Sequence, residues 1–194
     1  MIVKMKYLNL GAGGARIHEE GWINLDDLHS QLAPGTPERD ALDREQNYVN
    51  HDVSSGLLPF GNDEFDGILA SHFFEHFDAQ EAVRIIRECK RVLKPGGGLL
   101  VSVPDASYFR KVYPEDCVEN WPRLYEVTDP NNTIPTFFEA ALFFEQHKQV
   151  LTEDSLWCLF TRGGFEIRGL CVGAPEMVKH LNRLPFSLVM SAVK

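Results

Sequence analysis

Short apolar runs of strand length recur along the chain, and several of them end at a glycine or an acidic residue. Runs of this kind, bounded by turn residues, are typical of buried β-strands. They predict seven strands, at 7–10, 21–27, 48–53, 65–71, 99–103, 165–172 and 186–193. The chain therefore contains the segments of one large sheet.

The pattern changes to a helical period after Asp78. Apolar residues then fall on one face and charged residues on the other, with the apolar positions at Ala82, Val83, Ile85, Ile86, Cys89, Val92 and Leu93. Asp78 followed by Glu81 predicts a capping box, and Lys94, Pro95 and the glycines at 96–98 predict the end of the helix. This is the most regular helix expected in the chain.

Three further helical segments are expected. A single helical turn is predicted at 15–20, and a brief helix within 30–46. A longer helix is predicted to begin after Thr152 and to end at the glycine pair 163–164. Strands that alternate with helices in this way predict an α/β fold, with a mostly parallel sheet and helices on both faces.

Candidate ligand-binding residues follow the predicted strands. The glycine turn at 11–14, Asp26, Asp52 and the pair 71–72 each come at or just after a strand end. In open parallel sheets, ligands bind beyond the carboxyl ends of the strands, where the strand order reverses. We therefore expect these residues to converge on one crevice.

The stretch 104–150 differs from the rest of the chain. It holds nine of the 21 aromatic residues and five of the 11 prolines. That aromatic content favours a segment that packs over the crevice over a solvated loop. We expect a single domain over 1–194 with a lid-like insertion at about 104–150.

Length and charge narrow the class of partner. The 194 residues suit one compact domain, and the net charge of -9 opposes binding to phosphate backbones and anionic membranes. We expect a small-molecule substrate, no nucleic-acid or membrane partner, and a monomer or homodimer. The apolar part of the N-terminus is too short for a signal peptide, which predicts a cytoplasmic protein.

Six short motifs occur in a fixed order, at 8–14, 24–26, 51–53, 58–60, 65–68 and 93–97. Together they resemble the class I S-adenosylmethionine-dependent methyltransferases of the short bacterial type 11 kind. The resemblance implies a Rossmann-like seven-stranded sheet of order 3-2-1-4-5-7-6, with strand 7 antiparallel, and S-adenosyl-L-methionine as the cofactor. A dinucleotide site fits less well, because the third glycine of Gly-x-Gly-x-x-Gly would fall on Arg16.

The resemblance assigns the glycine turn to the methionine part of the cofactor. Gly11, Ala12 and Gly13 would let the backbone approach the ligand, and amides at the start of a following helix would meet its carboxylate. Asn9 stands where the family usually has an acidic residue two positions before the first glycine. That replacement removes a negative charge near the cofactor, so we expect weaker or differently arranged binding.

Two acids and two neighbours complete the implied cofactor site. Asp26 would accept both ribose hydroxyls, with Asp27 as its competitor, and Asp52 would accept from the adenine amine. Val53 would donate its backbone N–H to the adenine ring, and Ser71 would lie near the sulfonium. The alternative for both Asp26 and Asp52 is an acid that caps a turn or a helix.

Catalytic residues are harder to predict, because alignment of the acceptor with the methyl group supplies much of the rate of methyl transfer. A general base helps only an acceptor that ionises poorly. His72, after the fourth strand, and His147, at the end of the expected lid, are the candidates. The expected reaction moves a methyl group to an oxygen, nitrogen or carbon of a small acceptor, with sugar-containing molecules as one class.

Two other functions remain as alternatives. One is a regulatory module that binds S-adenosylmethionine without catalysis. The remote one is a zinc hydrolase, because His72-x-x-Glu75-His76 matches the His-x-x-Glu-His arrangement of inverted zinc peptidases. The predicted helix begins only at Asp78, which leaves too little helix to place both histidines on one face. We therefore predict no metal ligands.

Overall fold

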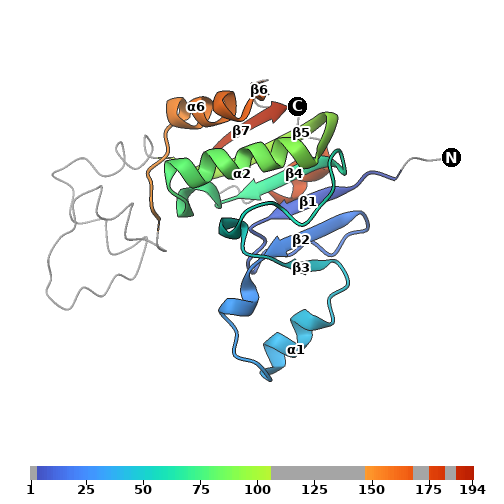
Figure 1. The fold of residues 1–194 in the computed structure, drawn as a ribbon. Coiled ribbons are helices and arrows are strands. Elements are labelled where there is room, and N and C mark those ends of the chain that lie inside the picture. Colours follow the sequence, from blue (N-terminus) through green and yellow to red (C-terminus); the bar gives the residue numbers. More distant parts are fainter. Residues whose placement is uncertain (1–3, 106–146, 168–174, 182–186) are drawn as a thin grey trace, which may run out of the picture.

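A seven-stranded sheet forms the centre of the computed structural model, in the order β3-β2-β1-β4-β5-β7-β6 (Figure 1). The structure describes residues 4–105, 147–167, 175–181 and 187–194. The segment 106–146, and with it almost all of the expected lid, lies outside the described residues. The observed strand order confirms the predicted one.

The strands have the following bounds: β1 Tyr7–Leu10, β2 Trp22–Asp26, β3 Tyr48–Asn50, β4 Phe65–Ser71, β5 Leu93–Pro104, β6 Glu166–Ile167 and β7 Ser187–Val193. The pairs β2–β3, β1–β2, β1–β4 and β4–β5 are parallel. Strand β7 is antiparallel to both β5 and β6, as expected.

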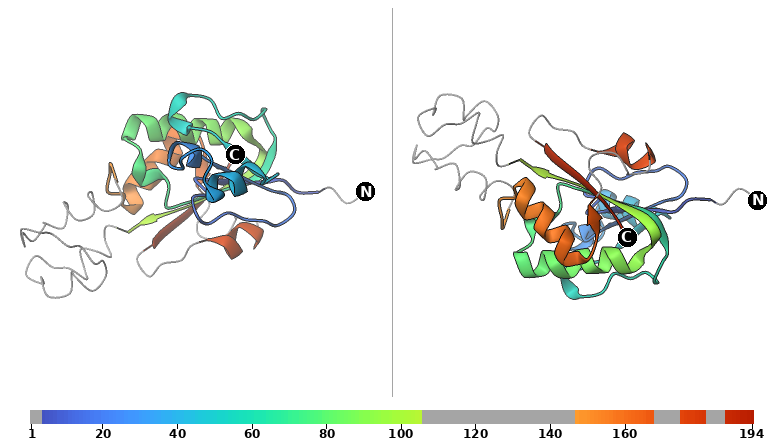
Figure 2. Two further views of the ribbon diagram at one scale, coloured as in Figure 1. Left: turned by 90° about the horizontal axis from the view of Figure 1, so that it is seen from below. Right: turned by 90° about the horizontal axis from the view of Figure 1, so that it is seen from above.

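Helices cover both faces of the sheet (Figure 2). The helices α2 and α6 lie on one side and α7 on the other. The described helices are α1 Pro37–Asp43, α2 Ala79–Val92, α6 Glu153–Gly163 and α7 Pro175–His180, with 3-10 turns η1 Leu28–Ser30, η2 Val53–Ser55 and η3 Phe74–His76. None of these helices has the length and apolar character needed to cross a bilayer.

Each face of the sheet has its own apolar core. The face under α2 and α6 buries the larger cluster, whose fully buried members include Leu8, Phe65, Ile68, Ile86 and Phe160. The opposite face buries a smaller cluster, formed by Tyr7, Ile17, Trp22, Leu69, Leu100, Met177 and Leu181. Successive side chains along a strand alternate between these two clusters, as Tyr7 and Leu8 do on β1.

The helix ends follow the predicted capping chemistry. Asp78 accepts from the backbone N–H groups of Gln80 and Glu81, and Glu81 accepts from the backbone N–H of Asp78. Helix α6 ends at Gly163, and the residue that caps it, Gly164, takes the left-handed conformation with φ +80°. Both helices are therefore anchored at residues recognisable in the sequence.

Three predicted elements differ in the structure. The helical turn expected at 15–20 is absent, because both backbone polar groups of Ile17 bond to the side chain of Asn24. Strand β3 stops at Asn50, before the 3-10 turn that Asp52 caps. Helix α2 ends at Val92, and β5 begins at the next residue with an irregular, glycine-rich start.

Candidate functional site

The carboxyl ends of β1, β2, β3 and β4 lie along one edge of the sheet, toward which their arrowheads point in Figure 1. The backbone N–H of His51, after β3, donates to the carbonyl oxygen of Asp26 at 3.0 Å. The backbone N–H of His72, after β4, donates to the carbonyl oxygen of Ser102 on β5 at 2.8 Å. The predicted site residues on these strands therefore share one edge.

The glycine turn is tied to the end of β2. The N–H groups of Gly11 and Ala12 both donate to the carbonyl oxygen of Leu25, and the N–H of Gly13 donates to Oδ2 of Asp26 at 2.8 Å. No helix follows the turn, so the prediction that helix-start amides meet the cofactor carboxylate is wrong. The reason is that the side chain of Asn24 holds the next segment in an irregular path.

The glycines of the turn face different surroundings. A Cβ atom on Gly11 would lie 2.2 Å from Cδ2 of Phe73, so the ring of Phe73 fills that space. A Cβ atom on Gly13 or Gly14 would meet nothing within 4 Å. Gly11 is therefore required by packing against Phe73, whereas the open side of the turn lies over Gly13 and Gly14.

Asp26 links the two strand ends and keeps acceptor capacity. Its Oδ1 accepts from the backbone N–H of Asp27 at 2.7 Å, while Oδ2 accepts from Gly13. Tyr48 donates its hydroxyl to the carbonyl oxygen of Asp26 at 2.7 Å, which holds the backbone rather than the carboxylate. Since an ionised carboxylate has about four acceptor positions, the two bonds leave room for hydroxyl donors.

The competitor Asp27 is oriented differently. Its Oδ1 accepts from the side-chain amide of Asn50 at 3.2 Å, on the β3 side of the β2 end. Of the two neighbouring acids, only Asp26 bonds to the glycine turn among the described residues. The geometry therefore favours Asp26 for a ligand that lies across β1 and β2.

Asp52 caps η2. Its carboxylate accepts from the hydroxyl of Ser54 at 2.6 Å and from the backbone N–H of Ser54 at 2.8 Å, and these bonds hold the pKa of Asp52 below its usual range. Val53 is buried beneath this turn. The turn-capping role considered for Asp52 is thus present, and contact with adenine stays a prediction for both residues.

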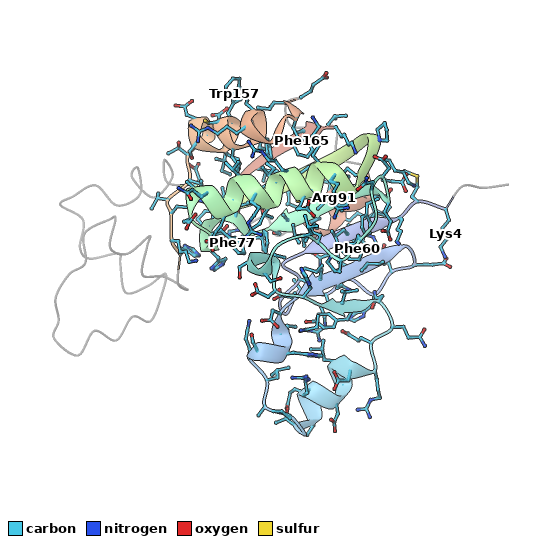
Figure 3. The ribbon with its side chains drawn as sticks, viewed as in Figure 1. Lys4, Phe60, Phe77, Arg91, Trp157 and Phe165 are labelled. Atoms are coloured by element: carbon cyan, nitrogen blue, oxygen red, sulfur yellow. The ribbon has the colours of Figure 1, made fainter. Side chains whose placement is uncertain are left out.

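The loop after β3 is held from α2. Arg84 donates to the carbonyl oxygens of Val53 and Gly56, at 3.3 and 3.0 Å, and to that of Ser54 at 3.0 Å. Arg91, also on α2, reaches the carbonyl oxygen of Phe60 at 2.9 Å (Figure 3). Two arginines therefore position the segment that carries the predicted adenine contacts.

Asn9 has a structural partner that sequence reasoning missed. It is 4% exposed, and its Nδ2 donates to the carbonyl oxygen of Ala15 and to Oδ1 of Asn24, both at 3.0 Å. Asn24 is directly opposite in the register of β1 and β2. The sequence offered one signal for this pair, because Asn9 and Asn24 are polar residues within two runs that are otherwise mostly apolar.

Ser71 and His72 lie on the β5 and β7 side of the strand end. The hydroxyls of Ser71 and Ser102 are 2.9 Å apart. Nε2 of His72 is 2.9 Å from the hydroxyl oxygen of Ser187, and its Nδ1 is 3.4 Å from Oε1 of Glu75. His72 has a positive φ of 50°, a conformation that side-chain-bearing residues adopt rarely.

His147 approaches the turn that follows His72. Its ring centroid is 4.9 Å from that of His76, and the next two residues, Lys148 and Gln149, both donate backbone N–H groups to the carbonyl oxygen of Glu75. His72 is beside the carboxylate of the same Glu75. Both predicted base candidates therefore lie near one buried acid, which the sequence did not single out for this role.

The His-x-x-Glu-His stretch has no α-helix to present its histidines. Residues Phe74–His76 form a 3-10 turn, and α2 begins only at Ala79. The helical geometry expected of an inverted zinc peptidase is therefore absent from this stretch.

A family model described as a methyltransferase domain matches residues 23–101. Among solved structures, a methyltransferase from Methanosarcina mazei is 24% identical, with a TM-score of 0.61 over 100% of this chain and 94% of that chain. A methyltransferase from Mesorhizobium loti is 19% identical, with a TM-score of 0.59 over 98% of this chain and 91% of that chain. The search of curated proteins found no match.

The structural likenesses show the fold, and the family model adds the methyltransferase signature over β2 to β5. The matched segment contains Asp26, Asp52 and Ser71, which follow the strands that meet at the candidate site. The methyltransferase-domain match over residues 23–101 and the strand order thus agree with the fold of the S-adenosylmethionine-dependent methyltransferases to which the chain is similar.

Proposed function

We propose that this chain is an S-adenosylmethionine-dependent methyltransferase that acts on a small-molecule acceptor, and that it holds S-adenosylmethionine across the carboxyl ends of β1 to β4. The observation that carries the proposed site is the bond from the Gly13 N–H to the Asp26 carboxylate. It brings an acid with remaining acceptor positions beside a glycine turn whose open side can admit a ligand.

Each proposed contact has a definite chemical role. Asp26 accepts from the ribose hydroxyls, and Asp52 and the Val53 N–H contact the adenine. Asn9 keeps the backbone of Gly11, Ala12 and Gly13 in position through Ala15, and Ser71 lies toward the sulfonium. When bound, the cofactor supplies a methyl group on a positively charged sulfur.

The chain's own task in catalysis is to align the acceptor and to remove a proton where the acceptor needs it. His72 is the better-placed base, because Ser187 fixes its Nε2 and Glu75 lies beside its Nδ1. His147 is the second candidate, through its position beside His76.

The cofactor site is tested by calorimetric titration with S-adenosylmethionine and S-adenosylhomocysteine. Asp26→Ala should weaken binding by about 1–3 kcal/mol, a rise in Kd of about 5- to 150-fold. Asp63→Ala is the matched control, because Asp63 is an exposed acid that pairs with Lys194 away from the site. If Asp27→Ala causes the loss instead, Asp27 is the ribose ligand, and no binding by the wild type at millimolar ligand contradicts the site as a whole.

The acceptor is tested by following S-adenosylhomocysteine release with panels of hydroxyl, amine and carbon-acid compounds. His72→Ala should lower kcat for a hydroxyl or amine acceptor by about 100-fold or more, with little change in cofactor affinity. An unchanged kcat removes His72 as the base, and the same measurement on His147→Ala then tests the second candidate.

A further inference from the structure

Glu75, His76 and His147 form a cluster outside the proposed cofactor contacts. One potential ligand atom from each of the three lies within 4.8 Å of the others. The two imidazole rings meet edge to face, with an interplanar angle of 77°. Two ring nitrogens and a carboxylate oxygen, contributed by η3 and by the segment that carries His147, therefore lie close together.

The carboxylate of Glu75 gives a second and independent reason to examine this cluster. Glu75 is 1% exposed, and neither of its carboxylate oxygens accepts a hydrogen bond within the part of the chain that the structure describes. Nδ1 of His72 lies 3.4 Å from Oε1 of Glu75. Buried carboxylates are ordinarily hydrogen-bonded, paired with a cation or bound to a metal.

Backbone bonds hold the cluster together. The N–H groups of Lys148 and Gln149 donate to the carbonyl oxygen of Glu75 at 2.8 and 3.3 Å. The side-chain amide of Gln149 donates to the carbonyl oxygen of Phe74 at 3.1 Å. The segment that carries His147 is thus fastened to η3 over two consecutive residues, so the three side chains are brought together before any ligand binds.

We propose that Glu75, His76 and His147 form a binding site for one divalent transition-metal ion. Two imidazoles and a carboxylate suit Zn²⁺ and its first-row neighbours, whereas Mg²⁺ and Ca²⁺ prefer oxygen ligands. Three protein ligands leave at least one coordination position open. The positive ion also neutralises the buried carboxylate of Glu75.

This site differs from the His-x-x-Glu-His arrangement considered from the sequence. The second histidine ligand is His147, 71 positions after His76, and His72 is not a member of the cluster. His72 instead stands beside Glu75, with its Nε2 engaged by Ser187. It can orient the carboxylate from outside the ligand set, as the second shell of many metal sites does.

The site lies next to the glycine turn. Phe73, two residues before Glu75, fills the space beside Gly11 and packs on Phe77 with ring centroids 4.8 Å apart. Phe77, labelled in Figure 3, directly follows His76 at the start of the segment leading to α2. A metal ion bound here would therefore stand beside the proposed methyl-transfer crevice.

The test is titration of the full chain with Zn²⁺, after dialysis against a chelator, followed by calorimetry. One ion should bind per chain, and Co²⁺ should give a visible absorption spectrum of a site with nitrogen and oxygen ligands. His147→Phe, which keeps an aromatic ring against His76, should weaken binding by at least about 100-fold, since even loss of an outer-shell partner costs 10- to 100-fold.

Three further variants make the test specific. His76→Phe should match His147→Phe, and Glu75→Gln, which keeps the shape of the side chain, should weaken binding as well. His18→Ala, which removes an exposed histidine, should leave the affinity within about twofold. Far-ultraviolet circular dichroism checks the fold of each variant.

Failure of the wild type to bind one ion, or binding that survives both His76→Phe and His147→Phe, would overturn the proposal. Loss of binding in His72→Ala together with retained binding in His147→Phe would also overturn it, in favour of the His-x-x-Glu-His pair. None of these readouts depends on methyl transfer, so they stand apart from the test of the cofactor site.

Discussion

The side-chain amide of Asn9 donates to Oδ1 of Asn24 at 3.0 Å, across the paired strands β1 and β2. Asn24 cannot turn its amide around, because its Oδ1 also accepts from the Ile17 N–H and its Nδ2 donates to the Ile17 carbonyl oxygen. Position 9 must therefore supply a donor. The methyltransferases that the chain resembles usually have an acid at this position, and the partner Asn24 explains why an amide is accommodated here instead.

Asn9→Asp should destabilise the protein by more than about 2 kcal/mol, because a buried carboxylate would face two acceptor oxygens with no donor. Asn9→Leu, of similar size and uncharged, should cost about 1–2 kcal/mol through lost hydrogen bonds alone. Urea unfolding of the two variants gives the comparison. An Asp variant as stable as the wild type would show that the amide donor is not required.

Gly11→Ala and Gly13→Ala should separate packing from ligand access. Gly11→Ala combines a left-handed backbone with a clash against Phe73 and should cost about 2–4 kcal/mol of unfolding free energy. In Gly13→Ala the added Cβ atom meets open space, so only the left-handed backbone opposes it and the loss should be about 1–2 kcal/mol of unfolding free energy. The same Cβ atom lies on the open side of the turn and should weaken cofactor binding.

Denaturant unfolding and calorimetric titration measure the two effects of these glycine variants. Adding Phe73→Leu to Gly11→Ala should restore part of the lost stability, because the smaller leucine side chain leaves room for the added Cβ atom at position 11. Equal destabilisation by both alanines, with no rescue, would be inconsistent with the packing role of Gly11.

Arg84→Ala should loosen the loop after β3, since Arg84 bonds to the carbonyl oxygens of Val53, Ser54 and Gly56. We expect a loss of about 1–3 kcal/mol in stability. Cofactor affinity should fall severalfold, because the proposed adenine contacts would then be less well positioned. Arg87→Ala is the control, as Arg87 is exposed and donates to the carbonyl oxygen of Arg162 over a long 3.4 Å.

Hydrogen exchange over residues 53–56 is the direct readout for Arg84. Faster exchange there in Arg84→Ala, and not in Arg87→Ala, supports the positioning role. Unchanged exchange and unchanged affinity would show that the loop holds its shape without Arg84.

The stabilising effect of Glu88 should depend on pH. Burial opposes ionisation of Glu88, but Arg91 and the Leu58 N–H outweigh it, so its pKa lies below the usual range. A lowered pKa in the folded state stabilises above the unfolded pKa, and this stabilisation is lost as pH falls through the folded pKa. Glu88→Gln should therefore cost about 1–3 kcal/mol at pH 7.

The difference between the wild type and Glu88→Gln should shrink as the pH falls below the ordinary glutamate pKa of about 4.3. Urea unfolding across this pH range measures it. Glu20→Gln is a control at an exposed ion pair with Lys4 and should change stability little. A difference that stays constant with pH would contradict the role of the Glu88 charge.

Much of the fold could be predicted from local patterns. Short apolar runs located the seven strands, and the caps at Asp78 and Thr152 located the starts of α2 and α6. The helical turn at 15–20 could not be predicted correctly, because the Ile17 backbone bonds to a side chain on a neighbouring strand. Local propensity does not report such a competitor.

Part of the candidate site could also be recognised from the sequence. Asp26 and the glycine turn were recognisable as strand-end residues, and the structure joins them at 2.8 Å. The roles of Phe73 against Gly11 and of Glu75 between the histidines were not, because each depends on packing between segments distant in sequence.

The sequence by itself determined the order of strands and helices and which residues stand at strand ends, because both follow from the spacing of apolar and turn residues along the chain. Only the tertiary structure decided which of those residues meet. Strand register placed Asn9 opposite Asn24, and two backbone bonds to Glu75 brought His147 beside His76. Such contacts depend on the three-dimensional path of the backbone, which spacing along the chain does not specify.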